Sequence, residues 1–197
     1  NPIDDADMFV RQHYRDFLSR EADIYGLIFW KSEILSCYSD VACVHYKRTS
    51  VSGSFFLSIE FQQTGFLVYR YYQASFPGNA QRPRGFPRKG EFLTDTRKIG
   101  ENVLVGFTGW EAQLEANKQA FANAWVARPE FAAAYPNSLT NEQFVDALNA
   151  NTGNSHTQAE RDALVNGLAG GTETRATVVR KIAENETFKQ QAFNRAF

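Results

Sequence analysis

The chain has 197 residues, of which 43% are hydrophobic and 14% aromatic, and this composition suffices for a sizeable core rich in phenylalanine. Its 21 basic residues nearly balance 22 acidic ones, giving a formal net charge of −1, so no overall field attracts nucleic acid or an anionic membrane. The sequence contains no apolar run of 18 residues, and we therefore expect no membrane insertion.

The first predicted helix has its first turn at Asp4, Asp5 and Asp7, and from Phe9 onward its apolar residues recur at spacings of three and four. Asp23 precedes a second apolar run and is predicted to be the N-cap of a second helix. Gly26 in that first turn costs about 1 kcal/mol relative to alanine. We therefore expect the preceding helix to approach Gly26 closely.

This stretch resembles a known family in the following residues: Phe9, Val10, Tyr14, Phe17, Leu18, Arg20, Asp23, Gly26 and Trp30. The family is the bacterial domain of unknown function 4214, a short helical unit of secreted and cell-surface proteins that is thought similar to phycobilisome linker domains. Because the family has no agreed activity, the resemblance implies a helical fold and an extracellular location rather than a reaction.

Cys37 and Cys43 are the only two cysteines, and the residues between them favour a turn. A disulfide across this turn is the preferred interpretation, with two free buried thiols as the alternative. Two cysteines without a nearby second pair make a poor zinc site, so no metal is expected. Disulfides persist in oxidising compartments, and together with the resemblance this predicts a secreted or cell-surface protein.

The middle of the chain departs from the family pattern. Two short helices are predicted at 41–48 and 51–61, and a second unit opens at Gly65. The segment 77–90 is rich in Pro, Gly and Arg and is predicted to be a loop. Further helices are expected at 91–99 and 110–127, whereas residues 103–105 could form either a short strand or a buried helical turn.

The loop carries the one dense basic cluster of the sequence: Arg82, Arg84, Arg88 and Lys89 around Phe86. Such a cluster could bind an acidic polysaccharide, a phosphate or a nucleic acid. The alternative is a solvated insertion whose arginines pair with carboxylates of the same fold. Four charges in a chain of balanced charge favour the second interpretation.

A third unit is predicted from residue 137 onward, with helices near 141–151, 158–168 and 172–188. The phrase from Leu168 to Phe188 resembles the second half of the same family unit. The final residues, with Phe193 and Phe197, are read as the start of another helix whose partner is missing. We therefore predict self-interaction at this end, or a truncated segment.

These elements predict an all-α fold of stacked short helical repeat units in an orthogonal bundle, with a Pro/Gly/Arg-rich loop insertion. The predicted units are 1–62, 63–136 with the loop insertion at 77–90, and 137–197. Repeats of this size must stack on their neighbours to bury a core.

No catalytic motif stands out. The three histidines, His13, His45 and His156, lie far apart in the sequence and show no metal-ligand spacing. Glu21 and Asp23 could act as an acid and base or bind calcium, but helix capping and contact with Arg20 are the favoured roles. Glu60 is read as an ordinary surface charge. We expect no enzyme and no cofactor, although a hydrolase or lyase using scattered carboxylates stays open.

The leading functional hypothesis is a non-catalytic interaction module at the cell surface or in the extracellular matrix. Its expected partner is a protein, including a second copy in a multimer or filament. The alternative is a domain that binds an extracellular glycan through residues 82–89 and a nearby aromatic side chain.

Overall fold

The computed structural model describes residues 2–80, 82 and 85–196, and within them every regular element is a helix. This confirms the all-α class. The helices are η1 (Pro2–Asp4), α1 (Ala6–Leu18), α2 (Ile24–Leu35), α3 (Val41–Leu57), α4 (Ile59–Gln63), α5 (Gly65–Ser75), α6 (Lys89–Gly100), α7 (Trp110–Val126), α8 (Pro129–Ala134), α9 (Asn141–Asn151), α10 (Gln158–Gly170), α11 (Arg175–Glu184) and α12 (Glu186–Ala196).

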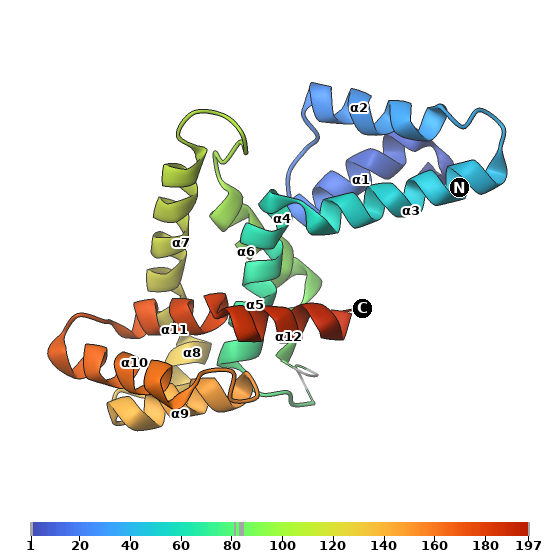
Figure 1. Ribbon diagram of the computed structural model, residues 1–197. Coiled ribbons are helices and arrows are strands. Elements are labelled where there is room, and N and C mark those ends of the chain that lie inside the picture. Colours follow the sequence, from blue (N-terminus) through green and yellow to red (C-terminus); the bar gives the residue numbers. More distant parts are fainter. Residues whose placement is uncertain (1, 81, 83–84, 197) are drawn as a thin grey trace.

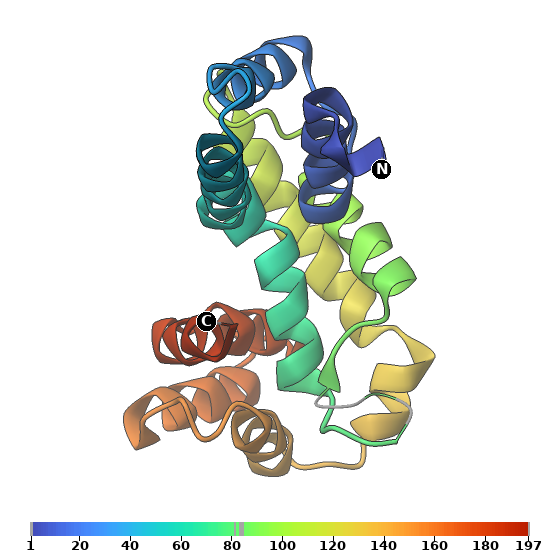
Figure 2. The ribbon, with the colours of Figure 1, turned by 90° about the vertical axis from the view of Figure 1, so that its right-hand side faces the viewer.

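The helices gather at two ends of an elongated molecule. The first three helices lie together at one end, and α9 to α12 lie at the other (Figure 1). Helix α5 runs between the two ends with α6 and α7 along it, as the turned view in Figure 2 shows. The long middle helices therefore connect the two groups.

Two hydrophobic clusters follow this arrangement. The first is built from α1 to α4 with Phe66 of α5 and Ala192 of α12. The second runs from Leu67 to Phe188 and is centred on fully buried Trp125. The second and third predicted units thus share one cluster, and the unit boundaries themselves stay a prediction.

Side-chain caps set most helix starts, as the sequence indicated. The carboxylate of Asp5 accepts a hydrogen bond from Met8 N, and that of Asp23 accepts one from Gly26 N, at 2.9 and 2.8 Å. The later helices repeat this order of caps with Thr140 before α9 and with the following residues: Thr157, Thr174 and Asn185. Asp23 starts α2, the second helix of the group α1 to α4, and Thr157 starts α10, the second helix of the group α9 to α12. The two helices therefore occupy equivalent positions in their groups.

Three predicted elements differ in the structure. Residues 41–57 form one helix rather than two, because the chain continues through the predicted break, where the Thr49 hydroxyl donates to the His45 carbonyl of the preceding turn at 3.0 Å. Asn185 divides the predicted helix 172–188, since its side chain accepts from Phe188 N at 3.0 Å and starts α12. Residues 103–105 form neither a strand nor a helical turn but part of the irregular connection between α6 and α7, with Val103 buried.

The last helix, α12, is packed against the rest of the described chain and does not lack a partner. Helix α12 begins at Glu186, so Phe193 lies in its second half rather than starting a new helix. The Phe193 ring packs against Phe56 and Phe66, with centroids 5.7 and 6.5 Å away. The argument that this residue needs a second chain to cover it therefore does not hold. Phe197 lies outside the described residues.

Candidate functional site

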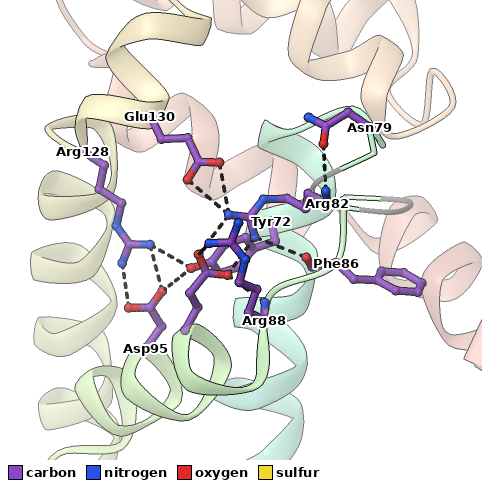
Figure 3. Close-up of polar contacts among 9 residues, drawn as sticks. Tyr72, Asn79, Arg82, Phe86, Arg88, Asp95, Arg128 and Glu130 are labelled. Carbon is purple, nitrogen blue, oxygen red and sulfur yellow. Dashed lines mark hydrogen bonds and ion pairs between the residues drawn. The ribbon is translucent and has the colours of Figure 1, made fainter.

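The basic loop is anchored by Arg82, whose side chain is only 5% exposed. Its guanidinium lies over the rings of Tyr72 and Phe76, 4.8 and 5.3 Å from their centroids. It donates to Glu91 at 2.9 and 3.0 Å and to Glu130 at 3.1 and 3.2 Å (Figure 3). Arg82 thus ties the loop to α6 and α8, and it pairs with carboxylates of its own fold.

A second arginine continues this network. Arg128, just before α8, makes a bidentate ion pair with buried Asp95 at 2.7 and 2.8 Å. Tyr72 donates its hydroxyl to Asp95 at 3.0 Å, and burial next to this carboxylate raises the tyrosine pKa (Figure 3). The hydrogen bond from Arg82 lowers the pKa of Glu91. Glu91 is therefore held ionised, which suits ion pairing and not proton donation to a substrate.

The other predicted site residues of the loop that the structure describes are more exposed than Arg82, although Arg88 shares its partner Glu91. Arg88 is exposed and lies 3.7 Å from Glu91, and Lys89 pairs at 3.5 Å with Asp16 of α1. Phe86 is 38% exposed and its ring lies 5.5 Å from that of Tyr69. Arg84 lies outside the described residues. The structure therefore separates an internal Arg82 from an accessible Phe86, Arg88 and Lys89.

The predicted motif of the first unit forms one connected site. A Cβ atom at Gly26 would lie 1.9 Å from the Tyr14 hydroxyl, which confirms the expected close approach of the preceding helix. Burial, followed by the charge of Asp23, raises the pKa of Tyr14 to about 12. The ring of Trp30 packs 5.8 Å from Phe55 in the first cluster.

Arg20 holds this motif against α4. It donates to both oxygens of Glu60, at 2.6 and 2.9 Å, and lies 3.5 Å from Asp23. Glu60 is only 11% exposed, so reading it as an ordinary surface charge was wrong. The sequence reasoning missed this pair because the two residues lie 40 positions apart and no local spacing joins them.

Cys37 and Cys43 form the preferred disulfide, with their Cα atoms 5.5 Å apart. The bond joins the turn after α2 to the first turn of α3. Among the residues described, no three His, Cys, Asp or Glu side chains are grouped to hold a metal ion. Nor does any described helix have the length and apolar character needed to cross a membrane.

The outer side of α2 is the feature that the sequence reasoning did not find. Ile24, Tyr25, Ile28, Phe29 and Leu35 are each more than half exposed. Their spacing places them along one side of the helix, which we call the α2 face. Leu27 and Ile34 are buried and Trp30 is half-buried, so α2 is apolar toward the core and toward solvent alike. A helix that is apolar all round is normally covered.

Helix α10 provides an internal reference for this surface. It packs on α9 as α2 packs on α1, and each of the two helices begins after a side-chain N-cap and is the second helix of its group. The positions of α10 that correspond to the α2 face, counted from the caps, are Gln158, Ala159, Asp162, Ala163 and Ala169. Since this helix lacks large apolar residues there, its place in the fold does not require them.

The chain was compared with known proteins. Residues 122–192 match the family model described as Domain of unknown function (DUF4214), which confirms the predicted family for this part of the chain. The phrase from Leu168 to Phe188 lies inside the match, whereas the motif from Phe9 to Trp30 lies outside it. The chain matches no curated protein and no solved structure at a significant level.

Proposed function

We propose that this chain, which carries a domain of unknown function (DUF4214) at residues 122–192, is a non-catalytic protein interaction module. The α2 face carries the proposal, because large apolar side chains in a continuous exposed patch are typical of interaction sites. The corresponding positions of α10 are small or polar, so the patch is not a by-product of the fold.

The local structure suits a preformed contact surface. The start of α2 is set by Asp23 and by the close approach of Tyr14 to Gly26. Its end is tied to α3 by the Cys37–Cys43 disulfide. A helix fixed at both ends loses little conformational freedom when a partner covers it, which favours binding.

The disulfide also supports the place where the module works. Disulfides persist outside the reducing cytoplasm, which supports the proposal that the protein works at the cell surface or in the extracellular matrix. Fractionating producing cells and assaying the redox state of Cys37 tests this. Recovery of the protein only in the cytoplasm with free thiols would contradict it.

Footprinting tests the interaction module directly. A photoactivated carbene labels exposed side chains, and tryptic cleavage after Arg20 and Lys31 isolates residues 21–31 from α2. We expect lower labelling of this peptide in the producing culture than in dilute purified protein. The peptide 162–175, which covers most of α10, serves as the internal control. Equal labelling of residues 21–31 in both settings would show that nothing covers the α2 face.

Glycan binding remains a second candidate, favoured by a hollow of about 340 Å³ beside Phe86. Tyr69 and Asn151 line it as well, and aromatic rings with amide groups suit a sugar ring. Arg195 also lines it, and its positive charge would favour an acidic saccharide. Titration with uronic acid oligosaccharides should show binding that Phe86→Ala weakens at least about tenfold, a loss of about 1.4 kcal/mol. Unchanged binding by that variant would remove this site.

A further inference from the structure

We infer that the occupant of the α2 face is a second copy of the same chain, packed α2 against α2 about a two-fold axis. This inference rests on the proposed function and names its partner. In a two-fold contact the same surface serves both copies, so one apolar stripe is sufficient for the whole interface.

The charged residues beside the α2 face favour an identical partner. Lys31 lies 3.5 Å from Asp7 of α1, and the Glu33 carboxylate lies 2.7 Å from Lys47 of α3. Each charge next to the stripe is therefore balanced within the chain. Two such faces can meet without like-charge repulsion, and neither offers an unbalanced charge that would select an acidic or basic partner. A membrane-bound helix would instead present an excess of Lys and Arg beside its apolar face.

The serine hydroxyl groups within the α2 face form hydrogen bonds to carbonyl groups of the same helix. Ser32 donates to the Phe29 carbonyl and Ser36 donates to the Glu33 carbonyl, both at 2.8 Å. A dry contact would therefore leave neither serine hydroxyl without a partner. Ser32 lies near the middle of the stripe, and a small residue there lets two helices approach closely.

The size of the face predicts a weak, reversible dimer. Five side chains that are more than half exposed present on the order of 500 Å² per copy, so a dimer would bury about 1,000 Å² in total. This is near the lower limit for a specific protein interface. We therefore expect dimers to appear with rising concentration and to separate on dilution.

The decisive variant replaces the α2 face with the side chains that α10 carries at the corresponding positions. It is the fivefold change Ile24→Gln, Tyr25→Ala, Ile28→Asp, Phe29→Ala and Leu35→Ala. Because all five residues are exposed, we expect an unchanged helical circular dichroism spectrum and cooperative unfolding. Light scattering across a concentration series should show the native chain growing toward twice the monomer mass and the variant remaining a monomer.

A cysteine placed at the centre of the stripe adds a positive test. Ser32→Cys should form a disulfide-linked dimer under mild oxidation, because residue 32 would meet its own copy near the two-fold axis. Asn166→Cys, at the corresponding position of α10, is the control and should remain monomeric. Peptide mapping verifies that Cys37–Cys43 stays intact in both.

The outcomes separate the inference from the proposed function. A native chain that remains monomeric at high concentration would overturn self-docking. If the footprint of residues 21–31 is nevertheless protected in the culture, the interaction module stands and its partner is a different molecule. Association with neutral lipid vesicles in place of dimers would likewise overturn self-docking. Dimers that persist in the fivefold variant would move the contact to another surface.

Discussion

The helix pairs α1–α2 and α9–α10 follow similar cap patterns, but they are stabilised and exposed differently. Arg20 secures the first pair to α4 through Glu60, which is nearly buried. Arg161 in the second pair binds Asp146, which is 54% exposed. The outer surface is apolar in α2 and small or polar in α10. The comparison teaches that one backbone pattern can carry a nearly buried ion pair with an apolar outer surface, or a solvated ion pair with a small or polar one.

Removing the arginine from each of the two ion pairs, Arg20–Glu60 and Arg161–Asp146, should give the largest difference in stability. Arg20→Met leaves Glu60 without its ion-pair partner in a site that water scarcely reaches, and should lower the free energy of unfolding by about 3 kcal/mol. Arg161→Met is the matched control and should cost under about 1 kcal/mol, because water replaces the lost partner of Asp146. Urea denaturation of both variants measures the contrast. Equal losses of unfolding free energy would mean that burial does not distinguish the two ion pairs.

Crowding the contact between α1 and α2 should have the next largest effect. Gly26→Ala places a methyl group against the Tyr14 hydroxyl and should cost about 2 kcal/mol despite the better helix propensity of alanine. Adding Tyr14→Phe removes the closest atom and should restore part of the loss. Thermal and urea unfolding measure both. If alanine at position 26 stabilises the protein, the two helices are not in tight contact.

The disulfide is a further difference between the two helix pairs, because no cysteine lies in or near α10. Opening the short Cys37–Cys43 loop should lower stability by about 2 kcal/mol through the greater freedom of the unfolded chain. Urea denaturation with and without reductant measures this. The double variant Cys37→Ser and Cys43→Ser should match the reduced native chain and respond to no reductant. A response to reductant in that variant would point to an unrelated effect.

The smallest expected effect is a pH dependence from His13. Burial lowers the pKa of His13, whose Nδ1 donates to the Phe9 carbonyl at 2.9 Å and whose Nε2 lies 2.8 Å from Ser52 Oγ. The unfolded chain therefore binds a proton more readily than the folded chain. Stability should be constant above the unfolded histidine pKa of about 6.5 and should fall as pH drops below it.

The variant His13→Gln should reduce this loss between pH 6.5 and 5, before most carboxylates titrate. His156 in the other region also has its pKa lowered by burial, so part of the slope should remain. Urea denaturation at a series of pH values gives both slopes. An unchanged slope in the His13 variant would assign the whole effect elsewhere.

Much of the local structure followed from the sequence. Asp23 was found as a cap because a short polar side chain before an apolar periodic run satisfies free amide groups at a helix start. The Gly26 contact followed from the cost of glycine in a helix. Residues 41–57 were divided incorrectly at Thr49 and Ser50, because these residue types have low helix propensity although the structure continues the helix through them.

The tertiary structure decided the roles of the candidate site residues. The sequence by itself determined an all-helical protein with a cysteine pair and a family unit, because caps, periodicity and short loops act between near neighbours. Only the packing placed Arg82 between two glutamates, and only the packing brought Glu60 to Arg20 from 40 residues away. It also turned one side of α2 toward solvent, because an apolar residue in a sequence does not say whether a neighbour will cover it.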